Sequence, residues 1–298
     1  MSRQSMLDYL TCKTNDYEKK DGLVLSGLVP TGDFVTVRSP VCERPILHTG
    51  YDVFGVHWTA SIPTAHCTLN QKRLIEDIED WRECVRFPVV DRFNWEAVAE
   101  HAKTVDREDH VTLCTLINGP FERTTTLMTF EDCLVNAISE PEEFKALIDA
   151  LCDYRIEIIE HLAEYVKPDV INLHDDWGTS TNMMLSPDLW REVIKPGTKR
   201  IYDRCHELGI IVGQHSCGHI EEIVGDMVEM GCQIWEAQGS CNNIAELEKQ
   251  YGDRLRILVP VEDDQSTEKA GNAADAPPVE AMPIGYQPFK EVPEWLYA

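Results

Sequence analysis

The stretch Gly209-Ile-Ile-Val-Gly-Gln-His-Ser-Cys-Gly-His219 joins a short apolar run to histidine and cysteine, residue types that often bind metals. Residues 210–213 predict a buried strand, and apolar residues at helical spacing follow from Ile220. His215 and Cys217 therefore lie at the C-terminal tip of the strand, where residues two apart point to the same side. An imidazole nitrogen and a thiolate sulfur suit zinc. The positive end of the following helix would lower the pKa of Cys217. The alternative is a structural strand end with an ordinary buried cysteine.

Composition limits the class of protein. The chain has 298 residues, of which 43% are hydrophobic, enough for one large barrel or two modest domains. It has no run of about 18 apolar residues and no apolar signal-peptide core near its start, so we expect a cytoplasmic protein. Its 11 cysteines follow no repeated spacing and indicate reduced thiols, which leaves Cys217 able to bind a metal.

The charge balance is strongly acidic. The chain has 52 Asp and Glu against 27 Lys and Arg, a formal net charge of −25, so we expect neither nucleic acid nor membrane partners. The acidic excess fits either a docking surface for a basic patch or the solvated outer faces of helices.

Strands, polar loops and helices alternate from residue 111 onward. Residues 111–117 and 170–173 are typical of buried strands, and polar loops over residues 118–123 and 174–179 follow them. This alternation predicts a parallel sheet or barrel with right-handed crossovers. The polar loops then share the C-terminal rim, where barrels bind ligands. Other strands are expected over residues 51–58, 232–238 and 255–259.

Helices are expected between the strands. Ser186, Pro187 and Asp188 supply an N-cap, a first-turn proline and a first-turn acid, so a helix should run to about Leu208 with a bend near Pro196. Further helices are expected over residues 70–85, 95–105, 131–138, 141–166, 220–228 and 244–251.

The C-terminal part differs in composition. Residues 261–283 have hardly any large apolar side chains and predict a disordered tail. Residues 284–298 are aromatic enough to dock elsewhere on the protein. We therefore expect a barrel domain over residues 1–260 and a low-complexity tail over residues 261–298.

Several motifs, in order, resemble segments of the uroporphyrinogen decarboxylase superfamily. They are Tyr51-Asp-Val-Phe-Gly-Val-His-Trp58, Gly119-Pro-Phe-Glu-Arg123, His174-Asp-Asp-Trp-Gly-Thr179, Ser186-Pro-Asp-Leu-Trp-Arg-Glu-Val-Ile-Lys-Pro196 and His215-Ser-Cys-Gly218. The chain is most similar to the cobalamin-linked methyltransferase branch, over residues 51–258. Several motifs in the right order are more specific than a single His-x-Cys pair.

The resemblance implies a fold, a metal and a partner. The fold would be a single (β/α)8 TIM barrel of the uroporphyrinogen decarboxylase type. In the methyltransferase branch, zinc is held by a His-x-Cys pair that corresponds to His215 and Cys217. Such enzymes move a methyl group between a small substrate and the cobalt of a corrinoid (cobalamin) carried by a corrinoid-binding protein.

The chain departs from the family at the last strand. Thiol-methylating members carry a third, cysteine ligand there, but no cysteine follows Cys241 in this sequence. Cys241 is the nearest substitute ligand, and Glu236 and Asp176 are weaker candidates. The barrel would be either incomplete or completed by residues 284–298.

Other rim residues are candidates for catalysis and for substrate binding. We expect His174, Asp175 and Asp176 to be catalytic, because adjacent carboxyl groups can tune a proton donor. The alternatives are a structural histidine and carboxylates that cap the loop before Ser186. The candidates for clamping an aromatic ring, if they are not core residues, are Trp58, Trp177 and Trp235. The candidates for binding polar groups of the substrate are Asp52, Asn118 and Arg123, the last with a structural ion pair as its alternative.

These features predict a zinc methyltransferase, for example an O-demethylase acting on a methoxylated aromatic, or an enzyme acting on a thiol. Zinc can polarise an ether oxygen or hold a thiol as its thiolate. Two alternatives stay open. One is a truncated, non-catalytic relative that binds a corrinoid protein or a small ligand. The other is uroporphyrinogen decarboxylase of porphyrin (haem) biosynthesis, which uses no metal and whose N-terminal arginine motif has no counterpart that we recognise here.

Overall fold

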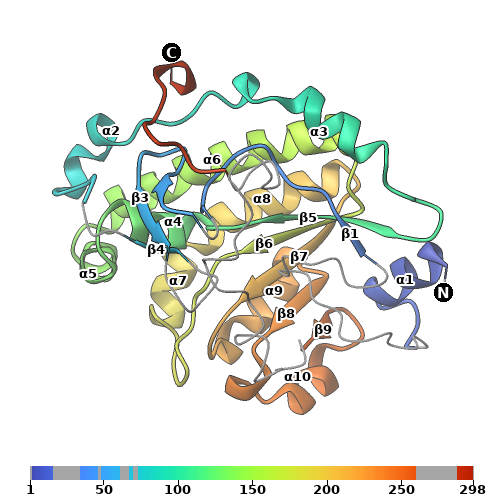
Figure 1. Ribbon diagram of the computed structural model, residues 1–298. Coiled ribbons are helices and arrows are strands. Elements are labelled where there is room, and N and C mark those ends of the chain that lie inside the picture. Colours follow the sequence, from blue (N-terminus) through green and yellow to red (C-terminus); the bar gives the residue numbers. More distant parts are fainter. Residues whose placement is uncertain are drawn as a thin grey trace.

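A parallel sheet forms the centre of the molecule (Figure 1). The computed structural model describes residues 2–15, 34–45, 48–60, 67–69, 73–259 and 287–297. Its 6-stranded sheet has the order β1-β5-β6-β7-β8-β9, and every neighbouring pair is parallel. The strands are β1 (Phe34–Thr36), β5 (Val111–Leu116), β6 (Val170–His174), β7 (Ile211–Ser216), β8 (Ile234–Ala237) and β9 (Arg256–Leu258). The predicted α/β fold of the TIM-barrel type is confirmed, and β1 and β9 are the ends of the sheet within these residues.

Helices cover the outer face of the sheet, with α6 and α8 lying along it (Figure 1). Alternate strand residues such as Ile171, Val212 and Ile257 face this layer and join its apolar core. The helices are α3 (Trp95–Ala102), α4 (Pro120–Leu127), α5 (Phe130–Ser139), α6 (Pro141–Tyr165), α7 (Pro187–Val193), α8 (Lys195–Glu207), α9 (Val224–Met230) and α10 (Ile244–Tyr251). Short 3-10 turns are η1 (Ile78–Asp80), η2 (Val90–Arg92), η3 (Glu221–Ile223), η4 (Gly239–Cys241) and η7 (Glu294–Leu296).

The bend predicted near Pro196 is confirmed. Ser186 caps α7 by accepting the backbone N–H of Leu189, and the chain divides at Ile194 into α7 and α8. Pro196 lies in the first turn of α8, where a missing N–H costs nothing. Two tandem helices therefore replace one straight helix before β7.

The amino ends of the strands are covered by α1 (Arg3–Leu10), which lies beside β1 (Figure 1). Met6 and Leu10 pack with inward-facing strand residues such as Val111 and Val170 in a separate apolar cluster. Arg3 forms an ion pair with Asp169. The amino ends of the strands are thus covered mainly by apolar side chains.

The expected strand over residues 51–58 is instead part of a small antiparallel sheet of β2 (Gly50–Tyr51), β3 (His57–Ala60) and β4 (Cys67–Leu69). The side chain of Asp52 accepts the backbone N–H groups of Phe54 and Val56 and so stabilises a turn between β2 and β3. Gly55 in this turn has φ 81°, a conformation that favours glycine.

The expected helix over residues 70–85 is also wrong, as far as the structure describes it. Only η1 and α2 (Trp81–Cys84) are helical from residue 73 on. The backbone N–H groups of Leu74 and Ile75 donate to the carbonyl of Leu127, at 2.8 and 3.0 Å. This tertiary pairing takes the place of the helical hydrogen bonds.

The C-terminal segment, residues 287–297, packs on the β2–β3 hairpin (Figure 1). Phe289 pairs antiparallel with Tyr51, and Leu296 is fully buried, its carbonyl accepting the N–H of Val89. This segment therefore does not complete the barrel as an eighth strand. The predicted disordered tail falls mostly on residues 260–286, outside the described ranges.

None of the helices in the described ranges combines the length and apolarity needed to cross a bilayer.

Candidate metal centre at the carboxyl ends of the strands

Two histidines on neighbouring strands face each other at the carboxyl end of the sheet. His174 at the end of β6 is in register with His215 on β7, and their rings stack with centroids 4.3 Å apart. Asp176 follows β6, and one ligand atom from each of these three residues lies within 4.8 Å of the others. Nitrogen and carboxylate donors this close can share one divalent cation.

Cys217 adds a sulfur to this group. Its Sγ lies 3.3 Å from Nε2 of His215, and its backbone N–H donates to Oδ1 of Asp176 at 2.7 Å. Oδ1 of Asp176 is itself 3.6 Å from Nε2 of His215. We call His174, Asp176, His215 and Cys217 the candidate metal centre.

Each histidine is held from behind by a carboxylate. Nδ1 of His174 lies 3.1 Å from Glu122, at the start of α4, and Nδ1 of His215 lies 3.0 Å from Glu236 on β8. A carboxylate on one ring nitrogen fixes the ring and raises the basicity of the other nitrogen, the usual arrangement behind a metal-binding histidine. Nε2 of both rings is thus the atom available for an ion. No sequence pattern indicated the role of Glu122, and Glu236, a weaker candidate for a metal ligand, instead contacts Nδ1 of His215.

The electrostatic field of the centre favours positive charge. Burial lowers the pKa of His174, but Glu122 outweighs burial and raises that pKa to about 9. Burial likewise lowers the pKa of His215, but its hydrogen bonds with Cys217 and Glu236 raise it to about 9. The carboxylates that stabilise imidazolium charge would equally stabilise a bound cation.

The expectation of a lowered pKa at Cys217 is wrong. Burial and the Asp176 carboxylate raise the pKa of this thiol, and the hydrogen bond from His215 opposes them only in part. The helix that was expected directly behind Cys217 is preceded by η3 and begins only at Val224.

Asp175 faces away from the centre and caps α4. Its carboxylate accepts the backbone N–H groups of Phe121 and Glu122, at 3.2 and 2.8 Å, and Nε1 of Trp177 at 3.0 Å. Burial and the neighbouring Glu122 raise its pKa to about 8, against the pull of these donors. Asp175, which follows β6, thus caps α4, the helix that follows β5. It does not cap the loop before Ser186.

The same contact explains why residues 118–123 are not the loop that we expected. The helix α4 begins at Pro120, capped by Asp175 across the sheet. A Cβ added at Gly119 would lie 2.2 Å from Cβ of Asp175, so only glycine lets the two segments approach.

Cys241 does not join the candidate metal centre. It lies in η4, where its carbonyl accepts from Nδ1 of His219 at 2.8 Å and its Sγ is 3.8 Å from the hydroxyl of Ser240. Among the residues that the structure describes, the groups that lie with His215 are His174 and Asp176, the latter expected as a weaker candidate ligand.

A second polar cluster, which we call the buried ion network, consists of Glu43, Asp52, Asn118, Arg123 and Arg155. Arg123 donates to Asp52 at 2.6 Å, with side chains only 1% and 0% exposed. Arg155 forms a bidentate pair with Glu43 and also donates to the carbonyl of Asn118 at 2.6 Å. The side-chain amide of Asn118 donates to the carbonyl of Glu43 at 3.0 Å. Three residues expected to bind substrate are therefore engaged with one another or with the backbone.

The three candidate tryptophans are core residues. Nε1 of Trp58 donates to Asp52 at 2.9 Å, and Trp177 packs edge-on against Trp190. Trp235 is fully buried in the helix-facing core, because it precedes the inward-facing Glu236 and so points to the opposite side of β8. The expected aromatic clamp is not formed by these residues.

Comparison with known proteins identifies the family. The sequence pattern of the family "Uroporphyrinogen decarboxylase (URO-D)" matches residues 69–258, more than half of the chain. The protein therefore belongs to the URO-D family. No curated protein matches it.

A solved structure shows the same fold. A methyltransferase from Methanosarcina mazei aligns with a TM-score of 0.57 at 16% identity, covering 69% of this chain. The aligned part spans 59% of the length of that methyltransferase. The α/β architecture of this URO-D family member is thus also that of a methyltransferase.

Proposed function

We propose that the protein is a zinc-dependent methyltransferase that moves a methyl group between a small substrate and a corrinoid cofactor on a partner protein. The main support is the candidate metal centre, in which two imidazoles are held by carboxylates and keep Nε2 available beside Asp176 and Cys217. Family membership and the methyltransferase fold add to it.

Four residues would hold the zinc, namely His174, Asp176, His215 and Cys217. Nitrogen, oxygen and sulfur donors in one small space fit this ion better than magnesium or calcium, which prefer oxygen alone. When bound, zinc would supply a positive charge that stabilises the oxygen or sulfur atom losing or gaining the methyl group.

The other residues act by holding this centre in place. Glu122 and Glu236 fix the histidine rings and keep a proton on each Nδ1, so that Nε2 is the basic nitrogen. Asp175 caps α4 and thereby positions Glu122 behind His174. The substrate would be a methoxylated aromatic or a thiol, which needs no strong general base beyond the metal.

Several observations favour this reaction over porphyrinogen decarboxylation. Arg123 and Arg155 are buried and paired with Asp52 and Glu43, so they do not offer charges to substrate carboxylates. The net charge of −25 disfavours a polyanionic substrate. A decarboxylase that needs no metal has no use for Cys217 next to two anchored histidines.

The test combines metal content with turnover. Protein purified without chelators should hold one zinc per chain by mass spectrometry, and Cys217→Ser should lower this content while the matched variant Cys241→Ser keeps it. Incubation with methoxyarenes or methyl thioethers and a reduced corrinoid protein should change the cobalt absorbance. No zinc in the wild type, or unchanged zinc in Cys217→Ser, would remove the basis of the proposal. Zinc without methyl transfer would favour the non-catalytic alternative, and metal-independent CO₂ release from uroporphyrinogen would favour the decarboxylase.

A further inference from the structure

A buried asparagine lies below the candidate metal centre, and its side-chain amide forms no hydrogen bond within the described part of the chain. Asn172 precedes His174 by two residues on β6, so its side chain faces the same, inner side of the sheet. It is 0% exposed, and neither Oδ1 nor Nδ2 has a hydrogen-bond partner among the residues that the structure describes. Its neighbours in register are Thr115 on β5 and Gly213 on β7, which has no side chain.

A buried amide without hydrogen bonds lowers the stability of the folded protein unless a bound ligand supplies those bonds. A buried polar group without a partner destabilises a protein, and buried polar atoms in native structures nearly always have one. An apolar residue of the same size would make the resting protein more stable. The position of Asn172 therefore points to a ligand that supplies the missing hydrogen bonds.

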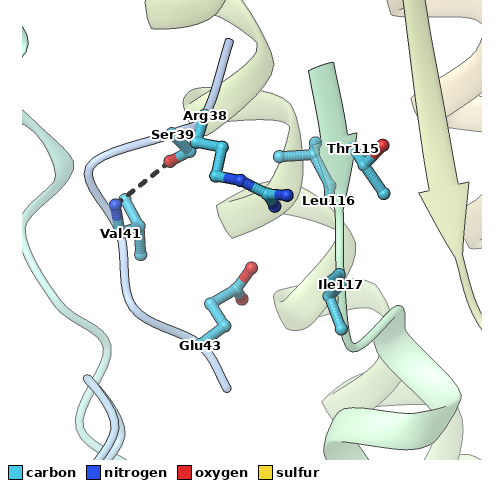
Figure 2. A pocket seen from close by; sticks show the side chains of 7 residues that line it. All are labelled: Arg38, Ser39, Val41, Glu43, Thr115, Leu116 and Ile117. Atoms are coloured by element: carbon cyan, nitrogen blue, oxygen red, sulfur yellow. Dashed lines mark hydrogen bonds between the residues drawn. The ribbon is translucent and has the colours of Figure 1, made fainter. Parts of the chain in front are cut away.

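Thr115 connects this position with a small pocket (Figure 2). The pocket lies between β5 and the segment after β1, and Figure 2 shows the guanidinium of Arg38 and the carboxylate of Glu43 pointing into it. The hydrogen bond from the N–H of Val37 to Leu113 continues the β1–β5 pairing and brings Arg38 opposite Thr115. The lining residues are Arg38, Ser39, Val41, Glu43, Thr115, Leu116 and Ile117.

The pocket suits a small anionic group. Its volume of about 30 Å³ admits a group such as one carboxylate rather than a ring. Burial lowers the pKa of Arg38 to about 10, which still leaves the guanidinium charged at neutral pH. Glu43, the carboxylate on the same wall, forms its ion pair with Arg155.

We propose that Asn172, Thr115 and Arg38 form a subsite that binds a carboxylate of the methyl-bearing substrate. The subsite lies two residues before His174 along β6, on the inner side of the sheet below the candidate metal centre. This inference rests on the proposed function and narrows its substrate class to small methylated carboxylic acids. Nδ2 of Asn172 and the guanidinium of Arg38 donate to the carboxylate oxygens. Oδ1 of Asn172 accepts from a hydroxyl of the substrate or from a bound water.

Matched ligands test the subsite directly. Calorimetry on zinc-loaded wild-type protein would compare 4-methoxybenzoate with 4-methoxybenzyl alcohol, and (methylthio)acetate with 2-(methylthio)ethanol. The acid of at least one pair should bind about 10-fold or more tightly than its alcohol. Asn172→Leu and Arg38→Met should each weaken binding of that acid by about 10- to 100-fold, as expected for hydrogen bonds to a charged group. Binding of the alcohol should change little.

Thr112 provides a matched control. Its hydroxyl is also buried with no partner in the described ranges, but it lies on the outer, helix-facing side of β5. Thr112→Val should leave ligand binding unchanged. Both Thr112→Val and Asn172→Leu should unfold at an equal or higher urea concentration than the wild type, because each removes an unpartnered polar group. A purely structural Asn172 would instead lose stability and leave acid binding intact.

The outcomes separate this inference from the proposed function. Equal binding of acids and alcohols by the zinc-loaded wild type, or wild-type acid binding by Asn172→Leu, would overturn the subsite and leave the methyltransferase proposal standing. Acid-selective binding that persists in protein without zinc, together with no methyl transfer, would keep the subsite and overturn the metal chemistry.

Discussion

The buried ion network and the candidate metal centre lie at the same end of the sheet but are built in opposite ways. In the network, each charged group faces an opposite charge, as Arg123 and Asp52 do at 2.6 Å. In the centre, carboxylates contact Nδ1 of His174 and of His215, and the two stacked rings keep their Nε2 atoms beside Asp176. Charged residues at a barrel rim therefore do not by themselves mark a ligand site. Donors that are anchored on one side and available on the other do.

The largest expected effect is on the network. Arg123→Met leaves the buried Asp52 without its counter-charge and should lower the free energy of unfolding by about 3–5 kcal/mol, measured by urea denaturation. Its zinc content should equal that of the wild type. Arg73→Met is the control, because Arg73 pairs with Asp132 at 46% exposure and should cost less than about 1 kcal/mol. Similar losses in both variants would contradict the contrast between buried and exposed pairs.

Removal of a ligand from the candidate metal centre should lower zinc affinity, whereas Arg123→Met should lower stability and leave zinc content unchanged. His174→Ala should weaken zinc binding by about 100- to 1000-fold, one donor's share of a site that binds zinc with roughly 10–16 kcal/mol. Competition with a chromophoric chelator measures this affinity. His161→Ala is the control, since His161 packs against Trp95 and Tyr165 and contacts Asp91, away from the centre. Full zinc affinity in His174→Ala would exclude this histidine as a ligand.

The anchoring carboxylates should have an intermediate effect. Glu236→Gln keeps the shape of the side chain behind His215 but removes its charge, and should weaken zinc binding by about 10- to 100-fold. The same chelator competition applies. An unchanged affinity would mean that the charge of Glu236 does not support metal binding by His215.

The smallest expected effect concerns a partly exposed cluster, in which Asp226 pairs with Arg191 and Lys195. Burial raises the pKa of Asp226, but its hydrogen bonds with Arg191 and Lys195 outweigh burial and lower that pKa below its ordinary value of 3.8. A lowered carboxyl pKa stabilises the fold above the ordinary value, and this stabilisation is lost as the pH falls through the native pKa. Asp226→Asn should therefore cost about 1 kcal/mol at pH 7. Urea denaturation should show the difference vanishing as the pH falls below 3.8 and through the native pKa of Asp226. A constant difference would contradict the ionic cause.

The sequence predicted the parts of the fold that depend on neighbouring residues. The alternation of strands and helices is confirmed from β5 to β9, and Ser186 caps α7 as expected. The approach of His215 and Cys217 follows from their spacing of two in an extended chain and is confirmed by their 3.3 Å contact.

The errors come from contacts between distant parts of the chain. Asp175 caps α4 from another strand, which turned an expected loop into a helix, and Glu122 reaches His174 from 52 positions away. No local pattern encodes these pairs. The misplacement of Trp235 was avoidable, since alternation along β8 means that Trp235 and Glu236 cannot both face inward.

The C-terminal segment, residues 287–297, is held by many contacts far from it in the chain. Arg86 pairs with Glu294, Arg92 donates to the carbonyl of Trp295, and the hydroxyl of Tyr297 donates to the carbonyl of Val53. A single proteolytic cut between residues 260 and 286 would therefore yield two fragments that stay associated. The same contacts would let a synthetic peptide restore a shortened chain, so this terminus offers a natural point for splitting and reassembling the protein.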